Sequence, residues 1–181
     1  MIPDKVFPYY KQSPGWVAYL GDFQWKSFQL TNGTWVFIRP TVLGGLCKVQ
    51  RPNKVDETIL QEIDQLGKEY SLFFLKLEPG NEVAAGLLRT YGYVKSDSPL
   101  VPPSSLYIDL NKSEEQLWCN VSRSGKYGVN RSNREGTIVE IIQKPSDERL
   151  KEYRAMLRAT ERRKKFLSLN YKELCSVRNH F

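Results

Sequence analysis

The sequence predicts an α/β fold built around a mixed sheet. A β-hairpin signal lies near the N-terminus, a nearly continuous apolar segment lies in the first half of the chain, and helical periodicity flanks that segment. The hairpin indicates antiparallel strands, whereas the apolar segment is typical of a strand covered by helices. Strands and helices in this order form an α/β unit.

The first expected element is a short helix that begins after Ser13. Serine is a favourable N-cap, and Pro14 follows at the first helical position. The helix carries Trp16, for which two roles stay open. It can anchor the core, or it can belong to a substrate-binding site.

Three strands are expected next. Trp25–Leu30 and Thr34–Arg39 flank Thr31-Asn32-Gly33, and Asn-Gly is a strong hairpin signal. Val42–Arg51 follows as the third strand. Its Gly44-Gly45 pair indicates a bulge or a close approach of two backbones.

A helix, a buried strand and a second helix complete the predicted unit. From Asp56, apolar residues recur at helical spacing as far as Tyr70, and Ser71–Leu77 is the apolar strand. A helix over Glu82–Tyr91 follows. Glu78 ends the strand, at the position where open α/β sheets place ligands. Its carboxylate could act as a general base toward an amine, or could serve only strand-end structure.

The segment after residue 104 combines structural signals with positive charge. Ser105–Leu110 alternates like a strand, and Ser113 with Gln116 forms a capping box that begins a helix. A basic run leads from there into a further expected strand, Thr137–Ile142. The cations of this run suit a phosphate or carboxylate, or a solvated helix face: Arg123, Lys126, Arg131 and Arg134.

A long helix is expected from Asp147, and a shorter one over Tyr171–Val177. Cations at spacings of three and four residues place one basic stripe on the long helix. Such a stripe fits a polyanion, or a solvated face that neighbouring glutamates partly neutralise. It comprises Lys151, Arg154, Arg158, Arg162 and Lys165.

Composition limits the possible partners. The net charge of +7 favours an anionic partner such as nucleic acid, a nucleotide-linked substrate or an anionic membrane face. The three cysteines lack Cys-x-x-Cys spacing, and with one histidine they form no plausible zinc site, so we expect no metal. Reduced cysteines and the lack of an apolar leader or membrane span suggest a cytoplasmic protein.

The order of short motifs resembles one family. A strand ending Ile-Asp-Leu, a helix opening S-E-E-x-L and the run K-x-x-x-x-R-x-x-R-E-G are similar to the Fem-type peptidoglycan aminoacyltransferases, FemA, FemB and FemX, also described as "methicillin resistance protein". Q-S-P-x-W near the N-terminus and L-K-L-E-P-G before residue 81 match the same pattern. The resemblance extends to about Ile142. A basic residue that the family carries on the first helix is absent here.

The resemblance implies a GNAT-like acyltransferase fold and a reaction. The reaction moves an amino acid from aminoacyl-tRNA to the stem peptide of a nucleotide-linked or lipid-linked peptidoglycan precursor, without metal or cofactor. It implies one complete domain, residues 1–104, followed at 105–181 by a linker strand, a basic helix and an incomplete second domain. We therefore expect little activity from this chain alone. Lys126, Arg131 and Arg134 would contact the precursor, and Arg154, Arg158 and Arg162 the tRNA.

Two other functions stay open. The first is an acyl-CoA-dependent N-acyltransferase of the same fold, although the usual pyrophosphate loop of such enzymes is missing, because Arg123-Ser-Gly-Lys-Tyr-Gly has the wrong spacing. The second is a non-catalytic RNA-binding or scaffold protein that uses the basic helix. Salt-dependent RNA binding without acyl transfer would favour this second function.

Overall fold

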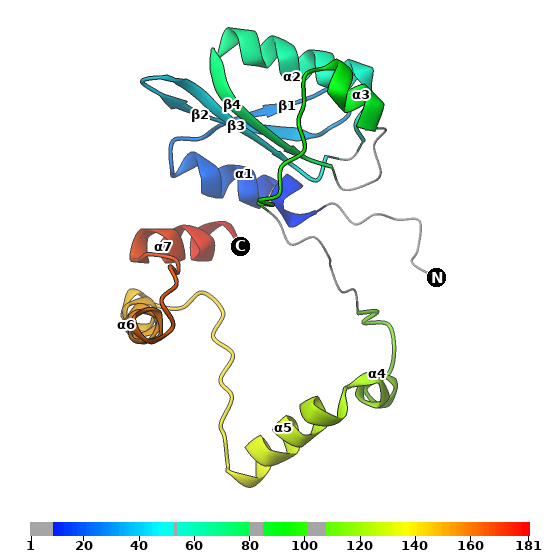
Figure 1. The fold of residues 1–181 in the computed structure, drawn as a ribbon. Helices are drawn as coiled ribbons and strands as arrows, with labels where there is room; N and C mark the ends of the chain where they lie inside the picture. Colours follow the sequence, from blue (N-terminus) through cyan, green and yellow to red (C-terminus); the bar gives the residue numbers. More distant parts are fainter. Residues whose placement is uncertain (1–8, 53, 80–84, 101–107) are drawn as a thin grey trace. The chain divides into compact units, whose positions relative to one another are not determined.

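The computed structural model describes residues 9–52, 54–79, 85–100 and 108–181. The chain forms two compact units (Figure 1). Unit 1 consists of Met1–Pro102 together with Pro145–Phe181, and unit 2 is Pro103–Lys144. The predicted division of the chain into domains at residue 104 stays a prediction.

Unit 1 contains a four-stranded mixed sheet in the order β1-β2-β3-β4. The strands β1 and β2 form the antiparallel hairpin expected around Asn32-Gly33, and β3 pairs antiparallel with β2 and parallel with β4. The mixed sheet is therefore confirmed. The strands are β1 Lys26–Gln29, β2 Trp35–Thr41, β3 Gly44–Gln50 and β4 Leu72–Glu78.

Helices cover both faces of this sheet (Figure 1). One face packs on α1, through Tyr19 and Leu20 against Phe37 of β2, and the other packs on α2. The helical elements of unit 1 are η1 Tyr10–Gln12, α1 Pro14–Gly21, α2 Glu57–Glu69, α3 Ala85–Thr90, α6 Asp147–Lys164 and α7 Tyr171–His180.

The expected helix starts are confirmed by their caps. The Ser13 hydroxyl accepts from the Trp16 amide at 3.3 Å, and the Asp56 carboxylate accepts from the Ile59 amide at 3.2 Å. Such caps satisfy amides that the first turn of a helix leaves without partners.

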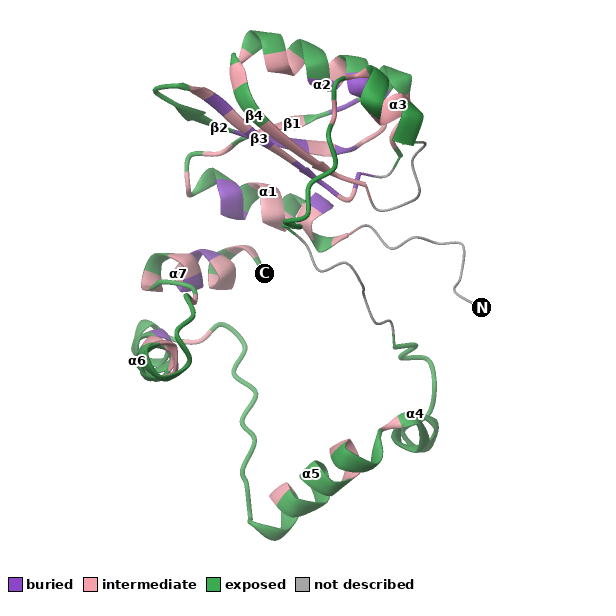
Figure 2. Cartoon of the chain, in the orientation of Figure 1, coloured by how far each residue is buried: buried purple, intermediate pink, exposed green. Residues whose placement is uncertain are grey.

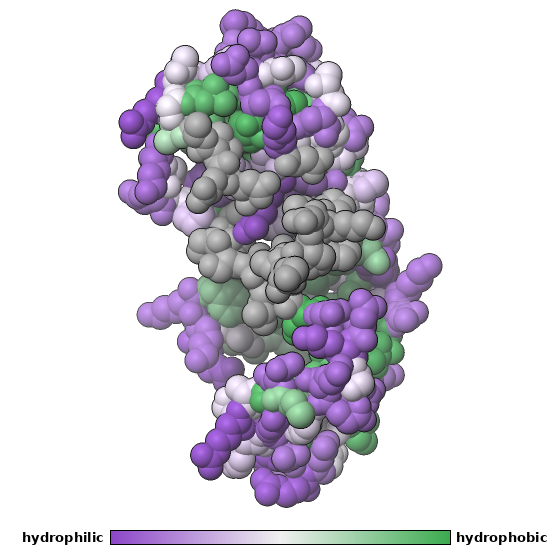
Figure 3. All heavy atoms as spheres, turned by 90° about the vertical axis from the view of Figure 1, so that its right-hand side faces the viewer, coloured by the Kyte–Doolittle hydropathy of each residue, from purple (hydrophilic) through white to green (hydrophobic). Residues whose placement is uncertain are grey.

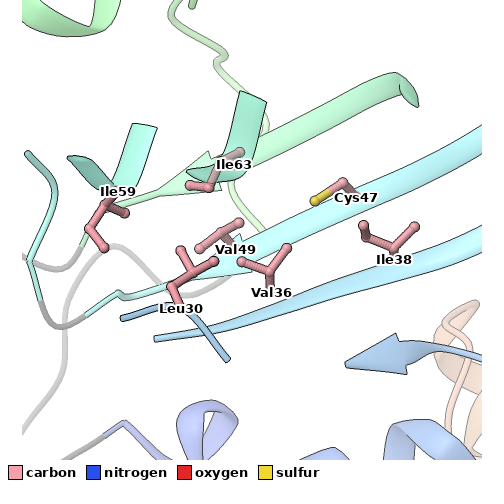
Figure 4. Packing of buried hydrophobic residues seen from close by; sticks show 7 residues of the cluster. All are labelled: Leu30, Val36, Ile38, Cys47, Val49, Ile59 and Ile63. Atoms are coloured by element: carbon pink, nitrogen blue, oxygen red, sulfur yellow. The ribbon is translucent and has the colours of Figure 1, made fainter. Parts of the chain in front are cut away.

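The main core lies between the sheet and α2 (Figure 4). Seven buried side chains converge there, and Cys47 among them is fully buried, which raises the pKa of its thiol to about 12. Burial is concentrated in the sheet (Figure 2). The seven are Leu30, Val36, Ile38, Cys47, Val49, Ile59 and Ile63.

The expected close approach at Gly44-Gly45 is confirmed. A Cβ on Gly44, whose φ is +119°, would lie 2.2 Å from the Ser71 carbonyl oxygen, and the β3–β4 register shifts between Gly45 and Leu46. The prediction that the apolar strand Ser71–Leu77 is buried on both faces is wrong. Because β4 is at the edge of the sheet, Phe73 and Phe74 remain 54% and 49% exposed.

Unit 2 contains two helices among its described residues, α4 Glu114–Asn120 and α5 Arg123–Arg134. The predicted capping box of Ser113 and Gln116 is present at the start of α4. The strand prediction for Ser105–Leu110 fails at Ile108–Leu110, which belong to no strand, and residues 105–107 lie outside the described residues.

The strand predicted over Thr137–Ile142 is also wrong. Ile138, Val139 and Ile141 are 91%, 80% and 86% exposed, and no strand is found among the described residues of unit 2 that could pair with this segment. Hydrophobic residues also lie among hydrophilic ones on the face of the molecule that Figure 3 draws. β-Propensity alone does not make a strand when no partner supplies the hydrogen bonds.

Within the described ranges, no helix combines the length and apolar character needed to cross a membrane.

Gly44, at the β3–β4 contact, and Gly67, in α2, allow a matched stability test. Gly44→Ala should lower the free energy of unfolding by about 2 kcal/mol or more, because the new Cβ meets backbone at a left-handed φ. Gly67→Ala, in α2 with ordinary contact to Leu72, should raise it by about 0.5–1 kcal/mol. Urea unfolding measures both. Equal stability of the two variants would contradict the close approach.

Candidate functional site

The face of the sheet toward α1 carries charged side chains in register. Phe37, Lys48 and Lys76 are paired across β2, β3 and β4. Directly paired residues point to the same side of a sheet, and Phe37 packs on α1, so both lysines share that side. Lys76 donates to Ser96 Oγ at 3.2 Å and to the Ser98 carbonyl, whereas Lys48 faces aromatic rings.

Lys48 is a half-buried cation among rings and other cations. Its Nζ lies 4.0 Å from the centroid of Trp25 and 5.9 Å from that of Trp16. Burial, reinforced by the charges of Lys11 and Arg39, lowers the pKa of Lys48 to about 8. A positive group that is both desolvated and repelled by its neighbours gains from an anion placed beside it.

A cavity of about 430 Å³ lies beside Lys48, within unit 1. Its walls come from α1 and the following loop, from β2 and β3, and from the first turn of α7. Aromatic rings and cations together suit a ligand that combines a flat or apolar part with negative charge. The lining side chains include Trp16, Tyr19, Phe23 and Trp25, the cations Arg39, Lys48 and Lys172, and the acids Asp22 and Glu173.

Trp16, on α1, forms part of the cavity wall and also packs against Tyr19 of the same helix. Its ring stacks on Tyr19 with centroids 4.9 Å apart, and Lys11 Nζ lies 5.5 Å from its centroid. The indole Nε1 is buried and has no hydrogen-bond acceptor among the described residues. Trp16 therefore packs in the cluster around Phe37 and also lines the cavity, whereas a part in binding substrate stays a prediction.

The carboxyl ends of β3 and β4 bring Gln50 and Glu78 together as a directly paired couple. Gln12 ties the β3 end to β2, because its Nε2 donates to the Gln50 carbonyl at 2.8 Å while its Oε1 accepts from the Trp35 amide at 2.6 Å. Gln50 is 2% exposed, and its Oε1 has no donor among the described residues.

Glu78 stands where the sequence predicted it, at the end of the parallel strand. One carboxylate oxygen accepts from the Leu100 amide, and the other is buried without a hydrogen-bond partner among the described residues. The charge of Glu78 also acts on Lys11, which in turn lies over Trp16. A carboxylate with one unused acceptor can take a proton or orient an amine.

The three predicted substrate residues of the basic run lie in unit 2, on α5. Lys126 donates to the Cys119 carbonyl at 3.2 Å and lies 5.9 Å from the Trp118 ring. Arg131 pairs with Glu135 at 2.7 Å, so part of its charge is neutralised within the helix, and Arg134 is exposed in the last turn. The run is thus a helix face with one internal ion pair.

The predicted stripe on α6 is not uniform. Arg158 and Arg162 are exposed, but the Arg154 side chain is only 17% exposed and pairs with Glu161 at 3.0 Å. Glu161 also accepts from the amide and the hydroxyl of Ser168, and these bonds, followed by that from Arg154, lower its pKa to about 2. Arg154 therefore stabilises the turn after α6 instead of lining an open basic face with the other two.

Sequence reasoning missed the cavity and its central lysine. Lys48 alternates with the buried Cys47 and Val49 along β3, so it had to occupy the opposite face from the main core. The antiparallel register of β2 and β3, which pairs Lys48 with Phe37, could have placed it on the side toward α1. The sequence around Lys172 and Glu173 gives no sign that they line the cavity, because they do so only when α7 packs against α1. Within the described ranges, no cluster of histidine, cysteine and acidic side chains could hold a metal.

This chain is similar to the solved structure of FemX. A crystal structure of FemX superposes with a TM-score of 0.66 and 20% sequence identity over 94% of this chain. The chain spans about half of that protein, 49% of its length. No protein-family model and no curated protein matches the sequence. The likeness confirms the predicted α/β fold with its mixed sheet and, at the level of fold, the resemblance to FemX.

If the cavity binds anions through Lys48, binding should depend on pH. A bound anion favours the ammonium form, so affinity should fall as the pH rises through about 8. Sulfate is a suitable probe because its charge stays constant over this range, and the indole N–H signals of Trp16 and Trp25 can report its binding by NMR. At pH 7, Lys48→Met should weaken binding by about tenfold or more, as expected for a lost charged hydrogen bond.

Lys26→Met provides the matched control, because Lys26 Nζ lies 5.0 Å from the Tyr70 ring, which packs against the core on the opposite face of the sheet. It removes the same charge and should leave sulfate binding unchanged. Equal losses in the two variants would mean that only net charge matters.

Proposed function

We propose that this chain belongs to a Fem-type aminoacyltransferase, which moves an amino acid from aminoacyl-tRNA to the stem peptide of a peptidoglycan precursor. The observation that carries the proposal is the shared fold with FemX over 94% of the chain. The sequence motifs that resemble the family point independently in the same direction. Because the chain spans about half of FemX, the complete reaction is proposed for the assembled enzyme and not for these residues alone.

The proposed chemistry needs positioning more than activation. The aminoacyl ester is already a reactive acyl donor, so catalysis consists of orienting the acceptor amine, removing its proton and stabilising the tetrahedral oxyanion. Glu78 is the candidate base, and its second carboxylate oxygen is buried without a hydrogen-bond partner among the described residues. In this proposal the oxygen receives the amine proton as the new amide bond forms, and the ester bond to the ribose oxygen of the tRNA breaks, which releases the tRNA as the leaving group.

The cavity next to Lys48 is the candidate site for a nucleotide-linked precursor. A diphosphate would contact Lys48 and Arg39, and Trp16 and Trp25 offer ring surfaces for the rest of the nucleotide. Lys48 and Arg39 could thus supply the charge that the family carries on its first helix, where this chain has no basic residue. In unit 2, Lys126, Arg131 and Arg134 remain candidates for contacts to a precursor.

The tRNA is assigned to Arg158 and Arg162, whose side chains are exposed on α6. Arg154, which shared the predicted stripe, is committed to Glu161 and Ser168 and is not part of this assignment. Guanidinium groups one helical turn apart can contact neighbouring phosphates. This assignment predicts a salt dependence that a solvated surface would not have.

Binding and transfer assays separate the parts of the proposal. The chain should bind a nucleotide-linked muramyl pentapeptide in calorimetry, and Lys48→Met should weaken that binding by about tenfold, while Lys26→Met should not. Glu78→Gln should leave the affinity unchanged but lower amino-acid transfer in the assembled enzyme by about 10²–10⁴-fold, the usual contribution of a general base. A chain that neither binds the precursor nor supports transfer would contradict the proposed function.

The tRNA assignment is tested by the salt dependence of binding. Arg158→Gln with Arg162→Gln should flatten the slope of log affinity against log salt by about 1.4, because each phosphate contact contributes about 0.7. Lys95→Gln with Lys112→Gln removes two exposed charges elsewhere and is the control. An unchanged slope in the arginine variant would mean that Arg158 and Arg162 contact no phosphate and form a solvated surface of α6. Electrophoretic mobility shifts at several salt concentrations give the measurement.

A further inference from the structure

The end of α6 joins four consecutive cations to an apolar turn. The sequence there reads Arg162-Arg163-Lys164-Lys165-Phe166-Leu167, and all six residues are exposed. The helix ends at Lys164, and Lys165 adopts a left-handed conformation with φ 55°, which turns the chain sharply. We call Arg163, Lys164, Lys165, Phe166 and Leu167 the basic-apolar corner.

The turn that carries the apolar side chains is held in place. Glu161 accepts from the Ser168 amide at 2.9 Å and from its hydroxyl at 2.6 Å, and pairs with Arg154 at 3.0 Å. The side chains of Arg154 and Glu161 are 17% and 16% exposed, so solvent screens this ion pair less than one at the surface. Glu161 thus fixes the position of Ser168, and the neighbouring side chain of Leu167 lies in solvent.

Leu167 is 97% exposed and Phe166 is 44% exposed. The hydrogen bonds of Ser168 hold the adjacent Leu167 in a position where its side chain is almost wholly in water. Packing within the chain does not account for this exposure. Leu167 also borders an apolar hollow of about 460 Å³ between α6 and α7, which Leu157, Leu169 and Leu174 help to line. No ion pair to an acid is found for the four cations within the described part of the chain.

We propose that the basic-apolar corner docks on an anionic phospholipid surface. The cations would lie at the headgroups, while Leu167 and Phe166 enter the boundary between headgroups and acyl chains. The cations of the corner match the anionic headgroups of such a surface, and its apolar side chains match the acyl chains. A nucleic acid would satisfy the cations, but it would give no gain for burying an aliphatic side chain such as Leu167.

This inference goes beyond the proposed transfer reaction and does not depend on it. The corner shares no residue with the tRNA candidates Arg158 and Arg162, although it begins directly after Arg162, and none with the lining of the cavity beside Lys48. Membrane docking would bring the chain to a surface that carries lipid-linked substrates, but the corner itself needs no substrate to bind.

The test is sedimentation of the full chain with vesicles of phosphatidylcholine alone, or of phosphatidylcholine with about one-third phosphatidylglycerol. Binding is expected only to the anionic vesicles and should weaken with salt. Arg163→Gln with Lys164→Gln should reduce binding about 25-fold, since each charge contributes about fivefold. Leu167→Asn should reduce it about tenfold, through lost apolar insertion. Lys95→Gln with Lys112→Gln removes two exposed charges elsewhere and should change it little.

Circular dichroism checks that each variant is folded, and exposure of all substituted side chains makes this the expected result. Loss of binding in both corner variants but not in the control supports the proposal. Failure of the wild-type chain to bind anionic vesicles overturns it. So does a Leu167→Asn variant that binds normally, because the corner would then be a site for polyanions in general. Binding of a folded RNA that is sensitive to Arg163 and Lys164 but not to Leu167 would assign the corner to nucleic acid instead.

Discussion

The parallel pairing of β3 with β4 is the constraint on which the rest of unit 1 depends. It begins at a contact so close that Gly44 has no room for a side chain next to the Ser71 carbonyl. From there the register runs to Gln50 opposite Glu78. This pairing directs Cys47 and Val49 into the core on α2 and leaves Lys48 on the face toward α1. The core and the charged face of the sheet are therefore two results of one register.

Lys48 connects the stability of this face with its chemistry. Partial burial of an ammonium group costs free energy unless something compensates it. Contact with the Trp25 ring returns about 0.5–2 kcal/mol, but Lys11 and Arg39 add repulsion in the opposite direction. The lowered pKa is the sign that compensation is incomplete. A cation left in this state at the wall of a cavity favours an anionic ligand more strongly than a fully solvated lysine would.

Local signals in the sequence were sufficient for most of the fold and for little of the site. Ser13, Asp56 and Ser113 mark helix starts through bonds to amides three residues away, so their effect can be inferred from neighbours. Glu78 could be placed because a strand end is also a local feature. The strand expected at Thr137–Ile142 failed because pairing needs a second strand, which sequence alternation does not supply. Arg154 looked like part of a stripe until Glu161 and Ser168, seven and fourteen residues away, proved to hold it.

The cavity also depends on contacts that span almost the whole chain. In α7, Ser176 donates to Asp22 Oδ2 at 2.6 Å and His180 Nε2 lies 3.0 Å from the same oxygen, which together hold the pKa of Asp22 below its ordinary value. A Cβ on Gly15 would lie 2.8 Å from the His180 carbonyl, so the two helices meet closely. Lys172 and Glu173 reach the cavity only because of this docking. The last helix of the chain therefore helps to complete a site whose other walls lie in its first third, and displacing α7 would remove one of the cations along with one wall.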